Sequence, residues 1–229
     1  MAQEVSGWGK SLTYLYPSPE QIPRYSDDIK RDIFRFTSLW LTEGVPHAFQ
    51  KNPIAYEYAR EAIAEMLNES TKNISLTGSA RIGFSMNPRR FGAAFNPNES
   101  DLDLFLVSER WFENLSTDFF TWLGRYRLDL AKPKTDLEAR YWKSNADDLP
   151  SHIKDKGFVD AWRIPNYERY EFVQLTNQAA ELFRTRLNSQ LPTDIAFKKV
   201  TLRVYKNWDR AISQIGGSLI GAIKKRPWN

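Results

Sequence analysis

Apolar and polar positions follow two different periods along this chain, and these periods separate expected helices from expected strands. Three segments repeat apolar residues every three or four positions, a spacing that places them on one face of a helix. The first follows Ser26 and ends near Gly44, the second opens at Asn52-Pro53, and the third follows Ser108 and continues to Leu130. We expect these three segments to be helices with buried apolar faces.

Later in the chain, a helix is predicted from about Tyr167 to Asn188, and Asn207 is expected to cap a last helix. Four short apolar runs are predicted to be strands because they are short or alternate in polarity. They are Ile74–Thr77, Asp101–Val107, the run around Asp160 in 157–165, and Val200–Tyr205. Together these elements predict an α/β (α+β) fold with a small mixed sheet.

Two stretches lack a clear period. Residues 1–25 contain three prolines among tyrosines and are expected to form an extended arm rather than a helix. Residues Lys132–Lys156 are polar and carry two prolines, so we expect a partly mobile surface segment there.

The stretch from Ile74 to Val107 contains the most informative chemistry. Asp101 and Asp103 alternate with leucines, so both side chains leave the same face of their strand. Neighbouring carboxylates repel each other and usually need a cation or water. Gly78-Ser79 follows the preceding strand and offers a hydroxyl and backbone N–H groups to phosphate oxygens. Taken singly, each motif also has a purely structural explanation: an acid pair at a strand end can lie on a solvated face, and Gly-Ser can form an ordinary turn.

A strand, then Gly78-Ser79, then a strand with Asp101-Leu102-Asp103 resembles the signature of the polymerase-β-like nucleotidyltransferase superfamily. In that superfamily a third acid on a neighbouring strand completes the site, and Asp160 is the candidate here. The resemblance covers about residues 73–165, the catalytic palm of the superfamily. The chain departs from it in the long gap between Ser79 and Asp101, which we interpret as an inserted basic loop.

The resemblance implies a single domain across 1–229, with the arm at 1–25, helices in 26–72, the palm at 73–165, and helices with a strand in 166–229. It also implies two Mg²⁺ or Mn²⁺ ions held by Asp101, Asp103 and Asp160, and triphosphate contacts from Gly78 and Ser79. For Asp160, the alternative is a structural acid paired with Arg163 or another base. Arg81, Arg89 and Arg90 are further candidates for binding the nucleotide.

Each of these arginines also has an ordinary interpretation. Arg81 could form a salt bridge on a helix surface, and Arg89 and Arg90 could lie in a solvated loop. Near the C-terminus, Arg203 and Lys206 flank Tyr205, which suits either base stacking or, as we prefer, packing of Tyr205 in the core.

The composition limits which metal sites the chain can form and which cellular compartment is expected. There is no cysteine, and His47 and His152 are far apart in the sequence, so thiolate or histidine-rich metal sites are excluded and a hard, oxygen-bound cation is expected. The formal net charge of +4 is compatible with a polyanionic partner. No apolar leader or membrane-length run is present, which predicts a cytoplasmic protein without membrane insertion.

We therefore expect an Mg²⁺-dependent enzyme that uses an NTP or dNTP, ATP among them. The compact chain resembles bacterial nucleotidyltransferases of anti-phage defence, which make oligonucleotides or nucleotide signals. Two alternatives remain open. One is a toxin–antitoxin type of enzyme that modifies tRNA or a partner protein, and the other is a non-catalytic nucleotide-binding module.

Overall fold

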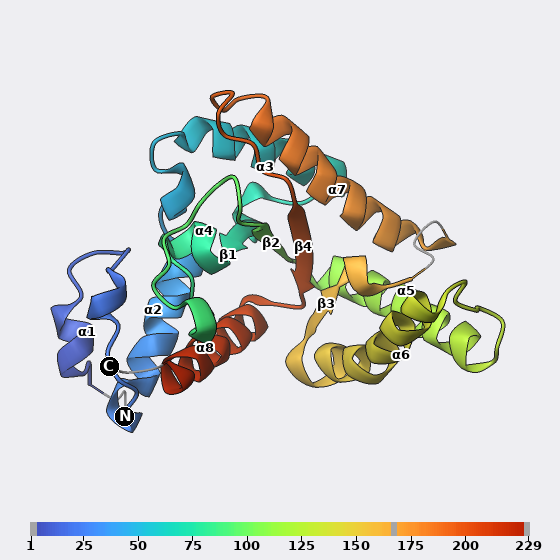
Figure 1. The fold of residues 1–229 in the computed structure, drawn as a ribbon, viewed down its shortest axis with the longest axis horizontal. Helices are drawn as coiled ribbons and strands as arrows, with labels where there is room; N and C mark the ends of the chain where they lie inside the picture. The colour runs from blue at the N-terminus through green and yellow to red at the C-terminus, as the bar shows by residue number, and fades with distance from the viewer. Residues whose placement is uncertain (1–3, 166–168, 227–229) are drawn as a thin grey trace.

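The computed structural model describes residues 4–165 and 169–226, and its centre is a four-stranded sheet (Figure 1). The strand order is β1-β2-β4-β3, with β1 antiparallel to β2, β2 parallel to β4, and β4 antiparallel to β3. The strands are β1 (Ile74–Thr77), β2 (Leu102–Val107), β3 (Phe158–Asp160) and β4 (Val200–Tyr205). The expected mixed α/β class with a small mixed sheet is confirmed.

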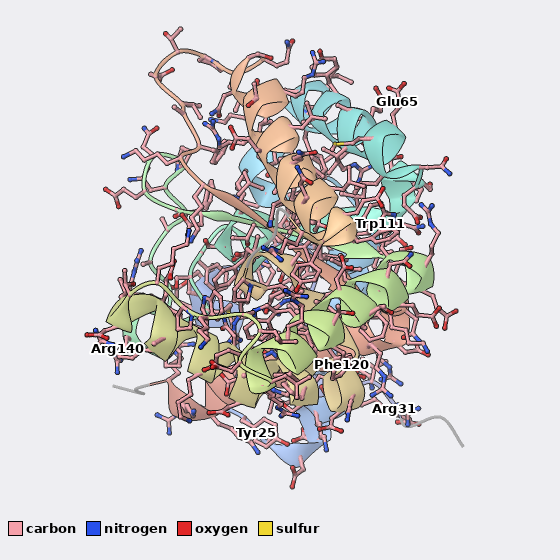
Figure 2. All side chains as sticks on the ribbon, turned by 90° about the vertical axis from the view of Figure 1, so that its right-hand side faces the viewer. Tyr25, Arg31, Glu65, Trp111, Phe120 and Arg140 are labelled. Carbon is pink, nitrogen blue, oxygen red and sulfur yellow. The ribbon has the colours of Figure 1, made fainter. Side chains whose placement is uncertain are left out.

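One face of the sheet is apolar and fully covered. Leu102, Leu104 and Leu106 of β2 are buried on this face among side chains from three helices. These helices are α3 (Pro53–Leu67), α5 (Glu109–Arg127) and α7 (Glu171–Asn188). Trp111 lies where α5 meets the other two, and its indole N–H donates to the Leu67 carbonyl at 3.0 Å (Figure 2). This face therefore forms the main hydrophobic core.

The opposite face is covered at one end only, by α2 (Lys30–Thr42) and α8 (Trp208–Lys225), which pack against each other (Figure 1). Phe105 and Tyr205 contact each other there and are buried with Ala211 of α8. Tyr205 is thus a core residue, as expected. The beginnings of β2 and β4 lie beyond this apolar contact and carry polar side chains on the same face.

Three of the predicted helix starts are present, but the side chain of Ser26 makes no capping hydrogen bond, and a 3₁₀ turn (Asp27–Ile29) precedes α2. Ser108 accepts a hydrogen bond from the Trp111 N–H, Asn207 accepts one from the Arg210 N–H, and Pro53 occupies the first turn of α3. These local signals fix where the helices begin.

Three expectations need comment. The segment 132–156 is helical rather than mobile: it forms α6 (Asp136–Ser151) and a π-helical turn (His152–Lys156). The arm at 1–25 contains a short helix, α1 (Gly7–Ser11), and is only partly extended. The predicted helix from Tyr167 begins at Glu171, and residues 166–168 lie outside the described part.

The inserted loop between β1 and β2 is folded back on itself. Phe84 and Ala94 form an isolated antiparallel bridge, and the Gly92 N–H donates to the Ser85 carbonyl at 3.0 Å. The helical turn η5 (Pro88–Arg90) at its tip contacts α8. No helix in the described ranges is both long and apolar enough to cross a membrane.

Candidate active site

The acid pair lies on the polar face of the sheet, as predicted. Asp101 directly precedes β2, and Asp103 is its second residue, paired with Thr77 on one side and Thr201 on the other. Both aspartates are solvent-accessible. Asp101 accepts from the Lys199 ammonium at 3.1 Å, and Asp103 accepts from the Thr201 hydroxyl at 3.1 Å.

Gly78 approaches the acid pair closely. It begins the short helix α4 (Gly78–Ile82) with φ of 70°, and a Cβ built on it would lie 3.0 Å from Asp103 Oδ2. Only glycine takes this backbone conformation readily and leaves room for the carboxylate. Ser79 is next in the chain, and within the described residues its hydroxyl has no hydrogen-bond partner. The structure therefore brings Gly78-Ser79 and the Asp-x-Asp motif together.

Desolvation raises the pKa of the Asp103 carboxyl, because protein atoms surround it on several sides although it remains accessible to solvent. The hydrogen bond from Thr201 and the charge of Arg203 oppose this rise, while the Asp101 carboxylate adds to it. Asp103 thus occupies a position where a cation would be favourable.

Asp160 is not where the triad prediction placed it. It ends β3, and the whole of β4 lies between β3 and β2, so the expectation of adjacent strands is wrong. Asp160 pairs with Arg203 whereas Asp103 pairs with Thr201, so the two acids are two strands and two residues apart. At about 4.8 Å per strand and 3.3 Å per residue, this puts roughly 12 Å between their backbones. The register does place both side chains on the same face.

The Asp160 carboxylate is already bound by a base. Arg203 of β4 donates to it from Nε at 2.7 Å and from Nη2 at 3.1 Å, and Asp160 is 4% exposed. Desolvation disfavours the charged guanidinium, but the Asp160 charge, the nearby Tyr205 and the hydrogen bonds to both residues together outweigh it and raise the pKa of Arg203. This arrangement matches the structural alternative for Asp160, with Arg203 rather than Arg163 as the partner. Arg163 instead pairs with Asp148 at 3.1 Å.

Strand β4 and the residue just before it supply one partner to each of the three acids. Lys199, Thr201 and Arg203 alternate along the chain, so all three face the polar side of the sheet. Sequence analysis missed Lys199 and Thr201 because their role depends on β4 lying beside β2. The alternation of Lys, Thr and Arg along a predicted strand was the available signal.

The donor set suits a small metal site but not the full triad. In residues 4–165 and 169–226, no three acidic, histidine or cysteine side chains are grouped so that they could hold a metal ion. Asp101 and Asp103 remain as two hard carboxylates on one face. Mg²⁺ is commonly held by one or two carboxylates together with substrate phosphates, so this pair fits such an ion.

A cavity of about 470 Å³ opens beside Gly78, between α4, α2, α8 and the inserted loop. Its walls are mostly apolar, and they include Met86, Leu219 and Ala222. Neither aspartate lines the cavity. Thr77 and Gly78 do line it, and Thr77 pairs with Asp103 while Gly78 closely approaches it, so the cavity lies beside the acid pair.

Arg81 lines the same cavity and is 2% exposed. It does not form the surface salt bridge considered above. Its guanidinium donates to the carbonyls of Glu43 and Gly44, its Nε is buried without a partner, and no described carboxylate pairs with it. Burial lowers the pKa of Arg81. A buried cation without a counter-ion favours an anionic ligand at this position.

Arg89 and Arg90 are exposed at the tip of the inserted loop, next to Pro88, which lines the cavity. The neighbouring Phe91 packs against Phe84. The two arginines therefore lie near the cavity mouth. Lys206 pairs with Glu109 at 3.1 Å and belongs to the other end of β4.

Comparisons of the chain with protein-family models, curated proteins and solved structures find no match.

Proposed function

We propose that the chain is a metal-dependent nucleotidyltransferase that uses an NTP or dNTP at the Asp101–Asp103 face. The observation that carries the proposal is the contact of Gly78 with Asp103 at the edge of a cavity large enough for a nucleotide. The same cavity is lined by Arg81, which is buried, donates to two backbone carbonyls and forms no salt bridge with a described carboxylate.

Each residue has a defined task in this proposal. Gly78 lets the triphosphate approach the backbone, Ser79 donates its hydroxyl to a phosphate oxygen, and Arg81 supplies positive charge inside the cavity. Thr201 holds Asp103 in place through its hydrogen bond. Arg89 and Arg90 add positive potential at the entrance.

Asp101 and Asp103 would hold Mg²⁺ or Mn²⁺ together with phosphate oxygens. When bound, the ion would neutralise the carboxylates and the phosphates and lower the pKa of the attacking hydroxyl. A second ion at Asp160 stays a prediction, and the Arg203 pair argues against it because the carboxylate is already neutralised.

The acceptor we propose is a further nucleotide, which gives an oligonucleotide or nucleotide signal of the kind used in anti-phage defence. Transfer to tRNA or to a partner protein is the alternative enzymatic outcome. The proposal for the acceptor depends on the resemblance in the sequence, and product analysis separates the outcomes.

A non-catalytic nucleotide-binding module is favoured by one specific observation. All three acids have a hydrogen-bond partner on the β4 chain segment, in Lys199, Thr201 and Arg203. Two of these partners are cations, so the fold neutralises Asp101 and Asp160 without a metal. Such a module would bind nucleotide in the cavity and release it unchanged.

The test uses each NTP and dNTP, labelled at the α-phosphate, with the purified chain in Mg²⁺ or in EDTA, alone or with tRNA. We expect new labelled products in Mg²⁺ from the chain alone, and none from Asp103→Asn. Asp147→Asn is the matched control, since Asp147 is an exposed acid paired only with Lys143 on α6. Binding without any product would favour the non-catalytic module.

A further inference from the structure

A chain of hydrogen bonds leads from the Asp160–Arg203 pair across to α8. Arg203 Nη1 lies 3.4 Å from the Tyr205 hydroxyl oxygen, and that hydroxyl lies 2.6 Å from Gln214 Oε1. Gln214 Nε2 then lies 3.2 Å from the Ser218 hydroxyl oxygen. This series of hydrogen bonds thus connects Asp160 of β3 with the Ser218 hydroxyl on α8.

Arg203 fixes the direction in which hydrogen bonds are donated along this series. A guanidinium has donors and no acceptor, so Arg203 must donate and the Tyr205 oxygen must accept. Tyr205 then uses its single hydrogen to donate to the Gln214 carbonyl, which turns the amide N–H₂ toward Ser218. Ser218 accepts this bond, and its own hydrogen remains available to donate.

Ser218 borders the 470 Å³ cavity, where its neighbours Ile215, Leu219 and Ala222 are apolar. Within the part of the chain that the structure describes, its hydroxyl hydrogen has no acceptor. The other polar side chains that line this cavity are Thr77, Arg81 and Lys225. A pocket usually selects the orientation and identity of a ring through a few placed polar groups in a mostly apolar wall.

We infer that Ser218 is a specificity-determining residue that donates a hydrogen bond to an acceptor atom on the edge of a nucleobase in the cavity. This inference rests on the proposed function, because the base is that of the nucleotide whose phosphates lie at Gly78 and Arg81. Tyr205 and Gln214 are positioning residues that keep Ser218 a donor. The ligand class is a flat heteroaromatic ring with an unprotonated acceptor edge.

The experiment measures the affinity of AMP, GMP, CMP and UMP in EDTA by calorimetry. Monophosphates carry the base but no pyrophosphate leaving group, so binding is separated from chemistry. We expect the wild-type chain to prefer some bases over others. Ser218→Ala should weaken the preferred nucleotide about fivefold, equivalent to one hydrogen bond, and reduce the preference. Ser218→Thr, which keeps a hydroxyl, should retain both.

Tyr205→Phe keeps the ring that packs on Phe105 but releases Gln214, so it should reduce the preference in the same direction by a smaller factor. Ser218 lines both the 470 Å³ cavity and a second, polar cavity that Gln214 and Ser213 also line. Ser213→Ala is the matched control, because Ser213 lies on the same helix and borders the polar cavity but not the 470 Å³ cavity. It should bind all four nucleotides as the wild type does. Circular dichroism of each variant checks that the helices are retained.

Equal affinity of the wild type for all four nucleotides would overturn the inference, and so would a preference unchanged in Ser218→Ala. In the second case the proposed function could still hold, since labelled product in Mg²⁺ reports on it independently. A Ser218-dependent preference without any product would refute catalysis and leave the base-reading role intact. No binding of any monophosphate by the wild type would also overturn the inference, and labelled product in Mg²⁺ would still decide the proposed function.

Discussion

The two faces of the central sheet differ in which elements cover them. On one face, Leu102, Leu104 and Leu106 are buried under α3, α5 and α7. On the other, Asp101 and Asp103 lie where α8 does not reach, with polar partners from the β4 segment. The same strand thus contributes to the core and to the candidate site through alternate residues.

This difference shows how a short strand can support both a stable core and a polar site. The apolar face supplies the free energy that holds β2 in place, so the acids on the opposite face need not contribute to stability. The fold therefore tolerates repulsion between the two aspartates. Substituting a leucine should lower the stability of the fold, whereas substituting an aspartate should change the candidate site.

The largest effect on stability is expected from Leu104→Ala. Leu104 is 1% exposed, and removing a buried leucine side chain typically lowers the free energy of unfolding by about 2–5 kcal/mol. Urea denaturation measures the loss. A change below about 1 kcal/mol would mean that this face is not the dense core described here.

A smaller loss is expected from Arg203→Met, which leaves the buried Asp160 carboxylate without its partner. We expect a decrease in the free energy of unfolding of about 1–3 kcal/mol, because the Arg203 side chain is partly exposed and water can reach it. Arg203→Met combined with Asp160→Asn should recover part of this loss. If the single variant is as stable as the wild type, the pair is not structural.

A pH-dependent effect is expected at Asp103, because desolvation raises the pKa of its carboxyl in the folded state. The folded state then holds the proton more tightly than the unfolded state. The wild type should therefore lose stability relative to Asp103→Asn as the pH rises from about 4, the ordinary range of an aspartate, through the raised value. Urea midpoints of both proteins across this range measure the difference in stability. A difference that shrinks as the pH rises would contradict the prediction.

The smallest effect is expected from Arg89→Ala with Arg90→Ala, at the exposed loop tip near the cavity. The double variant should bind nucleotide less tightly and show a shallower dependence of affinity on salt, because phosphate contacts are lost. Stability should remain unchanged. Equal affinities and equal salt slopes in the two proteins would make this loop a solvated insertion.

Local signals in the sequence predicted most elements, whereas pairing between distant segments was not predictable. Ser108 and Asn207 mark helix starts because capping depends on neighbouring residues. Helix α6 was missed because Asp147-Asp148 and Pro150 suggested a loop, although Trp142 and Leu149 at helical spacing are buried.

The candidate site shows the same limit. The approach of Gly78 to Asp103 was expected from the resemblance, and the antiparallel pairing of Thr77 with Asp103 brings the two together. The separation of Asp160 from β2 was not, since no local pattern reveals that β4 inserts between β2 and β3. Its pairing with Arg203 follows from that strand order.

In the proposed function, Asp101 and Asp103 form the reactive face, while Asp160 is a structural partner of Arg203. The most direct test compares Asp103→Asn with Asp160→Asn in the labelled-triphosphate assay, with circular dichroism confirming that each is folded. We expect no product from Asp103→Asn and continued Mg²⁺-dependent product from Asp160→Asn. Product from a folded Asp103→Asn, or its loss in a folded Asp160→Asn, would contradict the account.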